Sequence, residues 1–89
     1  MELPPTLTLN DAAAALRTLE DAAVKGQGVL AIDASALTAF DTAALALLLQ
    51  AKRLAHSGGR AFEVQGAPPK LTQLAQLYGV AELLGLKGA

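Results

Sequence analysis

Residues 29–57 read VLAIDASALTAFDTAALALLLQAKRLAHS and contain two distinct apolar patterns. Residues 29–33 form a short apolar run that ends in aspartate, which is typical of a strand buried on both faces. After Asp41–Thr42, apolar residues recur at helical spacing until Gly58–Gly59, which predicts a helix over residues 42–57. Residues 34–40 are expected to form the connecting loop.

The residues before this stretch repeat the order of strand and helix. Residues 6–9 alternate polar and apolar side chains, which predicts a short half-buried strand. Asn10–Asp11 supply an N-cap and a first-turn acid, and a glycine pair at 26 and 28 ends a helix predicted over residues 11–25. The apolar stripe of this helix contains Ala12, Leu16, Leu19 and Ala23.

The residues after it add a third strand and a third helix. Residues 61–65 alternate in polarity, with Glu63 and Gln65 on the polar face, so this strand is expected near a sheet edge. Pro68–Pro69 begins a helix that Gly79 ends, because proline fits the first turn of a helix. Residues 80–84 are expected to form one more helical turn.

The order of these elements predicts the fold class. Alternating strands and helices indicate an α/β protein with a small, mostly parallel sheet and right-handed crossovers. With 89 residues, the chain is expected to be a single domain, 1–89. Three strands form a small sheet, so an extra strand or a partner surface is expected to complete it.

Composition excludes several classes of function. A net charge of −1 argues against non-specific nucleic-acid binding, which needs a basic face. The absence of cysteine excludes disulfides, a thiolate nucleophile and a Cys-based zinc site. The N-terminus does not resemble a signal peptide, and the apolar run 43–49 is too short to cross a membrane, so a cytoplasmic location is expected.

The helix over residues 42–57 carries the candidate binding surface. Its apolar stripe should face the sheet and contains Ala44, Leu47, Leu48, Ala51, Leu54 and Ala55. Leu45 and Leu49 fall on the opposite side of the helical wheel, beside the basic residues Lys52, Arg53 and His56. We interpret the two leucines as anchors for a protein partner and the three basic residues as its charged rim. The alternative is that a neighbouring loop or the first helix covers both leucines.

Asp41 and Thr42 begin this helix and belong to the same candidate surface. One interpretation is that either residue is a plain N-cap. The other is that Thr42 is a regulatory hydroxyl, because a phosphate there would lie among unpaired amides at the positive end of the helix dipole. A phosphate would also place about two negative charges beside Leu45.

The chain offers no recognisable active site. His56 is the only histidine and has no second ligand of its kind for a metal, so neither a metal nor another cofactor is expected. Asp33 and Asp41 could lie close together as a catalytic carboxylate pair. The alternative is that both bind loop amides and shape the turns around them.

Residues 29–37 and 40–49, together with residues 58–65 and 74–80, resemble the STAS domain. The resemblance covers nearly the whole chain from about residue 6, and Asp41–Leu49 and Leu74–Val80 look most like the small STAS subunit (MlaB-like) of Mla-type phospholipid-transport ABC systems. The resemblance implies a non-catalytic cytoplasmic protein that binds the transporter's ATPase subunit. Contact with the inner face of the inner membrane would then be indirect, through that transporter.

A second implication of the family is open at this point. Some STAS domains are anti-sigma-factor antagonists, in which case the partner is an anti-sigma kinase and Thr42 is the phosphorylated residue. Ala43–Ala44 stand where the family usually has a glycine, which makes the helix start stiffer. The family also usually has a strand before the one predicted at 6–9, and its absence would leave a sheet edge that allows a homodimer.

Overall fold

The structure is a computed structural model that describes residues 1–86. The α/β class predicted from the sequence is confirmed, and the helix over residues 42–57 has the predicted bounds. The elements are β1 (Thr6–Leu7), α1 (Ala12–Lys25), β2 (Leu30–Asp33), β3 (Ala39–Phe40), α2 (Thr42–Ser57), β4 (Phe62–Gln65), α3 (Pro69–Leu77) and α4 (Ala81–Leu84).

The strands pair in parallel, as expected for strands joined by helical crossovers. β2 pairs with β4 from Leu30–Phe62 to Asp33–Gln65, and β1 pairs with β3 over two residues. Because β3 lies within residues 34–40, the prediction that this whole segment is a loop is wrong. Its last two residues are held in extended form by the backbone of the N-terminal segment.

The pairs β1–β3 and β2–β4 are separate two-stranded sheets rather than the single sheet expected from the sequence, and the residues before β1 connect them by pairing with β2. Met1 and Leu3 exchange three backbone hydrogen bonds of 2.7–2.9 Å with Ala31 and Asp33, and Glu2 forms a parallel bridge with Asp33. The prediction that no strand-like pairing precedes residue 6 is therefore wrong. Residues 1–7 run beside β2 first and then beside β3.

β1 is shorter than the strand predicted over residues 6–9. Asp11 accepts hydrogen bonds from the backbone and the hydroxyl of Thr8, at 3.1 and 3.0 Å, and its own amide donates to the Thr8 carbonyl. These bonds turn the chain away from the sheet after Leu7. Leu9, predicted to share the buried face of the strand, is consequently 77% exposed.

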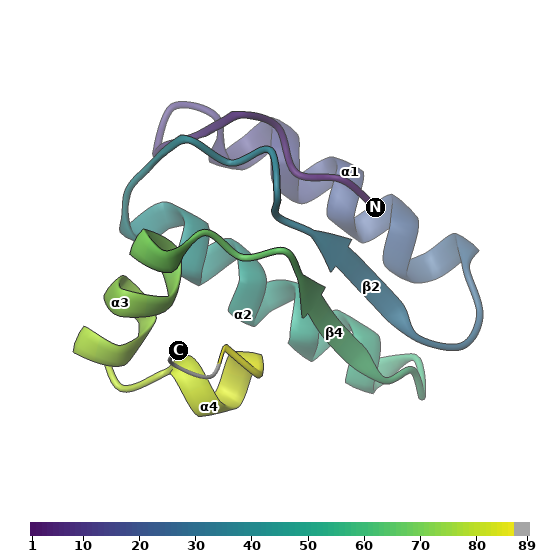
Figure 1. Cartoon of the computed structure of the whole chain (residues 1–89). Helices are drawn as coiled ribbons and strands as arrows, with labels where there is room; N and C mark the ends of the chain where they lie inside the picture. Colours follow the sequence, from purple (N-terminus) through teal and green to yellow (C-terminus); the bar gives the residue numbers. More distant parts are fainter. Residues whose placement is uncertain (87–89) are drawn as a thin grey trace.

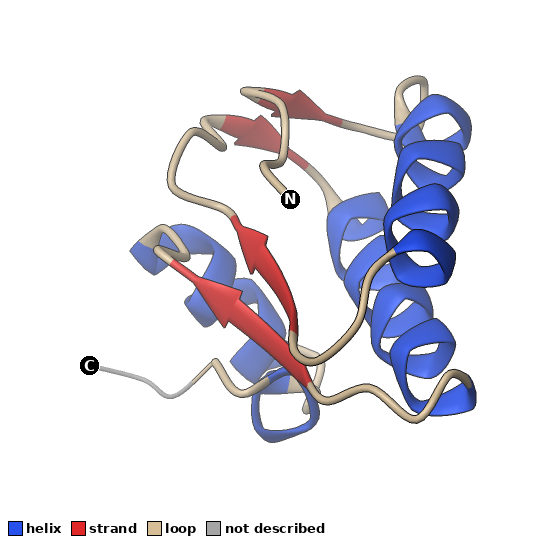
Figure 2. Cartoon of the chain, turned by 90° about the vertical axis from the view of Figure 1, so that its right-hand side faces the viewer, coloured by secondary structure: helices blue, strands red, loops and turns tan. Residues whose placement is uncertain are grey.

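The helices α1 and α2 cover one face of the β2–β4 pair. Both lie behind the two strands in Figure 1 and to the right of them in Figure 2. Glu63 and Gln65 are exposed on β4, whereas Phe62 and Val64 are partly buried and pack against the core, as the alternation predicts. The short helix α4 contacts α2 and α3.

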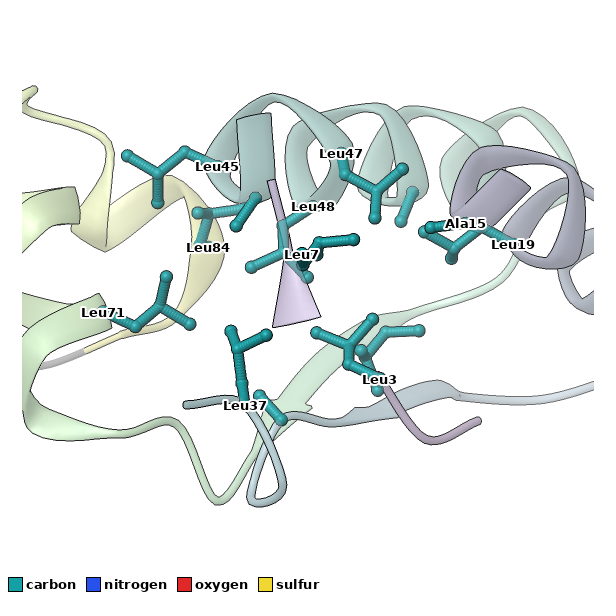
Figure 3. Close-up of a cluster of buried hydrophobic side chains, with 14 of the residues drawn as sticks. Leu3, Leu7, Ala15, Leu19, Leu37, Leu45, Leu47, Leu48, Leu71 and Leu84 are labelled. Carbon is teal, nitrogen blue, oxygen red and sulfur yellow. The ribbon is translucent and has the colours of Figure 1, made fainter. Parts of the chain in front are cut away.

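The core is aliphatic and lies between the helices and the sheet. Figure 3 shows leucines from the N-terminal segment, α1, α2, α3 and α4 converging on one cluster. The largest fully buried side chains are Leu3, Leu7, Leu19, Ile32, Leu48, Leu71 and Leu84. Contacts of this kind stabilise a small domain mainly by removing apolar area from water.

Arg60, just before β4, joins distant parts of the chain. Its guanidinium donates four hydrogen bonds to carbonyl oxygens, at distances of 2.8–3.3 Å. The acceptors are Ala22 and Ala23 in the last turn of α1, and Gly28 and Val29 before β2. The planar guanidinium therefore binds carbonyls at the end of α1, where the Ala22 carbonyl also accepts the Gly26 amide, and ties them to the segment before β2.

Candidate functional site

An apolar groove of about 340 Å³ lies between the first turns of α1 and α2. None of its lining residues is charged, and four of them are alanines that keep its floor open. The groove is lined by Leu9, Ala12, Ala13, Leu16, Ala43, Ala46, Leu47 and Gln50. The exposed side chain of Leu9 and the small side chains of the floor leave room for apolar groups of another protein.

Asp41 fixes one end of this groove. Its carboxylate accepts a 2.8 Å hydrogen bond from the Ala43 amide, so Asp41 is the N-cap of α2. The second oxygen accepts a 3.2 Å bond from the amide of Leu9. One carboxylate therefore holds the turn that carries Leu9 against the start of α2.

Thr42 is the first residue of α2, next to the groove-lining Ala43, and its side chain is exposed. Of the two candidate caps, Asp41 is the one that binds a first-turn amide. The hydroxyl of Thr42 is thus on the surface beside the groove.

Replacing Asp41 by alanine is expected to lower the free energy of unfolding by about 1–2 kcal/mol, the usual cost of losing an N-cap. Thr42→Ala is the matched control and should change stability by less than about 0.5 kcal/mol, because Thr42 is exposed and does not cap the helix. Urea unfolding of the three proteins measures both values. Equal losses in the two variants would contradict the assignment of the cap to Asp41.

The family model described as Mlab, STAS domain matches residues 1–85 of the chain. The chain belongs to the STAS domain family. The resemblance noted in the sequence is thereby confirmed, and the small α/β architecture is consistent with a STAS-like fold. A comparison with curated proteins gave no match.

STAS domains generally mediate protein–protein interactions and are generally non-catalytic. In this STAS domain, the groove and the Asp41–Thr42 turn lie together at the N-terminal end of α2. The residues predicted from the sequence as partner anchors lie further along the same helix, and the structure changes their interpretation.

Leu45 is buried, and the prediction that it is exposed is wrong. Its side chain is only 4% accessible, and in Figure 3 it lies beside Leu84 of α4. Leu49 is partly buried and packs against the same core. The sequence left open that a loop or the first helix covers these leucines, but it is the short helix α4 that packs on this part of α2.

The three basic residues of the STAS domain that follow on α2 differ in their surroundings. Lys52 is partly buried, and its ammonium group donates a hydrogen bond to the carbonyl of Leu83 in α4, so it holds that helix in place. Arg53 and His56 are exposed, as predicted. Their role in partner binding stays a prediction.

Asp33 and Asp41 each bind loop amides, as the second of the two interpretations expected. Asp33 is the last residue of β2 and accepts a 2.9 Å hydrogen bond from the amide of Ser35. The pKa of Asp33 lies below its ordinary value, because bonds from the Ser35 side chain and then from its backbone favour the ionised form. Its carboxylate thus shapes the turn after β2.

This lowered pKa predicts an acid-sensitive contribution to stability. A carboxyl group with a lowered pKa stabilises the fold at pH values above its ordinary pKa of 3.8. This contribution to stability is lost as the pH falls through the lower pKa of the folded state. The stability of Asp33→Asn should therefore fall less than that of the wild type as the pH drops below the ordinary value of 3.8. Ser35→Ala removes only the hydroxyl, so its loss of stability in acid should lie between those of the wild type and Asp33→Asn. Parallel acid unfolding curves for all three would contradict this role of Ser35.

Neither a metal-binding cluster nor a membrane-spanning helix is found among residues 1–86. These residues hold no group of three or more histidine or carboxylate side chains placed to bind a metal. None of their helices is both long enough and apolar enough to cross a membrane.

Sequence reasoning missed the contribution of α1 and Leu9 to the groove. The predicted stripe of α1 included Ala12 and Leu16, but both are only partly buried, and the buried face contains Ala15, Leu19 and Ala23. Ala12 and Leu16 instead turn towards α2 and line the groove. A signal was available in the Thr8–Asp11 turn chemistry, which predicts that the strand ends before Leu9.

Proposed function

We propose that this STAS domain is a non-catalytic subunit that binds the ATPase of an Mla-type phospholipid-transport ABC system. It would act in the cytoplasm, at the inner face of the inner membrane through that partner, and support transport that maintains outer-membrane lipid asymmetry. The family description and the likeness of residues 41–49 and 74–80 to the small Mla-type STAS subunit support this assignment.

The observation that carries the proposal is the uncharged groove beside Thr42. Its volume of about 340 Å³ is roughly twice that of the ~150 Å³ cavity that accepts a benzene-sized molecule. The groove therefore has room for about two apolar side chains. Apolar pockets filled by a few anchoring side chains are typical of protein–protein interfaces.

The test is affinity purification of the tagged chain from its native host, followed by mass spectrometry. We expect an ABC ATPase and its permease to co-purify with the STAS domain and to be absent from a tag-only control. Recovery of a histidine-kinase-like ATPase together with a sigma factor, without transporter subunits, would contradict the proposal.

The surface position of Thr42 favours a second candidate function, that of an anti-sigma-factor antagonist. The side chain is exposed at the first residue of α2, where a phosphate would meet the positive end of the helix dipole. About two added negative charges beside an apolar groove would weaken docking there. Phosphothreonine at residue 42 in protein isolated from cells, together with release of a kinase partner, would support this candidate.

A further inference from the structure

β4 has a backbone edge that no described strand covers. The amide of Leu30 donates to the Ala61 carbonyl, and the amide of Ala34 donates to the Gln65 carbonyl, each at 2.8 Å. Backbone groups alternate in direction along a strand, so residues 61, 63 and 65 face β2. The amides and carbonyls of Phe62 and Val64 therefore point away from β2, which is the only described strand that pairs with β4.

A groove of about 510 Å³ runs along this edge. One wall is the end of α2 with Lys52 and His56, and the other is α4 with the adjoining Gly85. Leu83 lines the groove and is 53% exposed. The edge of β4 thus borders an open space that contains an accessible apolar side chain.

The opposite edge of the sheet is blocked in a different way. Met1, Leu3 and Pro5 direct backbone groups towards β2 and β3, so Glu2 and Pro4 face outward. Proline has no amide hydrogen to donate and is typical of sheet edges that resist pairing. Phe62 and Val64 on β4 both keep this donor, so the β4 edge is the one suited to accept another strand.

We infer that the β4 edge binds an extended segment of a partner protein, which adds a strand beside Phe62–Gln65. Main-chain hydrogen bonds to Phe62 and Val64 supply the binding, as in other cases of strand addition. This surface lies at the C-terminal end of α2, whereas the groove of the proposed function lies at its N-terminal end. The inference does not depend on the identity of the ATPase partner.

The side chains around the edge define the segment that fits. Glu63 is exposed on the open face, so the opposing position of the added strand favours lysine or arginine. On the other face, the neighbouring residues of the segment point towards Leu83 and the half-buried Phe62 and Val64, and favour apolar side chains. The partner segment therefore alternates apolar and basic residues.

The test uses an acetylated, amidated peptide of alternating valine and lysine (VKVKV), titrated into the full-length ¹⁵N-labelled protein and followed by NMR. We expect the amide signals of Phe62 and Val64 to shift and those amides to exchange more slowly with solvent. Val64→Pro removes an outward donor without breaking the ladder to β2 and should weaken binding by at least about tenfold. Val24→Ser, at an exposed position of α1 that lines neither groove, should leave binding unchanged.

A charge reversal provides a second, independent test that does not place proline in a strand. Glu63→Lys should weaken binding of the valine–lysine peptide by about threefold and strengthen binding of the corresponding valine–glutamate peptide by a similar factor. Peptide binding that is unaffected by both substitutions, or that shifts no β4 amide, would overturn the inference. It would also be overturned if β4 amides were protected without peptide in a dimeric protein, because a second copy would then occupy the edge.

Discussion

Replacing Arg60 by alanine is expected to lower the free energy of unfolding by about 2–3 kcal/mol, the range for losing hydrogen bonds to a charged donor. The guanidinium binds four carbonyls at the end of α1 and before β2, and three of these lie at least 32 positions away in sequence. A small domain is stable by only about 5–15 kcal/mol, so this loss is large. Thermal unfolding should show it as a melting temperature lower by about 10–20 °C.

Two further variants separate the hydrogen-bond pattern from the charge. Arg60→Lys keeps the charge but presents one ammonium instead of a planar fork, so it should recover only part of the loss. Gly26→Ala places a methyl group 2.9 Å from the Arg60 guanidinium and should displace it, with a smaller destabilisation. A change of less than about 0.5 kcal/mol in Arg60→Ala, as for an ordinary surface substitution, would contradict the stabilising role assigned to Arg60.

The sequence predicted the elements whose signals are local. The observed bounds of α2 agree with the predicted ones because Asp41 caps its first turn and a glycine follows its last residue. The polarity of β4 agrees because one face of the strand packs on the core and the other meets water. The signals for these features lie in neighbouring residues of the sequence, so periodicity predicts them directly.

Features that depend on residues far apart in the chain could not be predicted from the sequence. The two residues of β3 carry no strand pattern and are extended only because the N-terminal segment binds them. Arg60 reads as an ordinary loop residue until α1 and β2 are placed around it. Both depend on contacts across about 30 residues of chain, which no local pattern encodes.

The candidate site shows the same division. Asp41 and Thr42 were found because a capping residue before an apolar run is a local signal. Leu45 was misjudged because its burial depends on α4, a four-residue helix almost 40 positions later. A wheel of one helix shows which residues share a side, but it does not show which other elements cover that side.

Introducing arginine at Ala46 is expected to abolish binding of the partner through the groove beside Thr42. Ala46 is exposed in the second turn of α2 and lines the groove, so a charged side chain there would occupy the space for the partner's apolar groups. A charge buried in an interface without a counter-ion costs at least about 2 kcal/mol, which weakens affinity by about 30-fold or more. Co-purification and titration calorimetry with the recovered ATPase measure this loss.

The matched control places the same residue further along the same helix. Ser57→Arg adds arginine at an exposed position of α2 that lies outside both grooves, so it should bind the partner as the wild type does. Leu9→Ser, which truncates a side chain that is 77% exposed, should weaken binding without loss of stability. If Ser57→Arg weakened binding and Ala46→Arg did not, the partner would dock at the C-terminal end of α2, next to the basic residues that the sequence predicted. The pair of variants therefore decides which end of one helix this STAS domain presents to its partner.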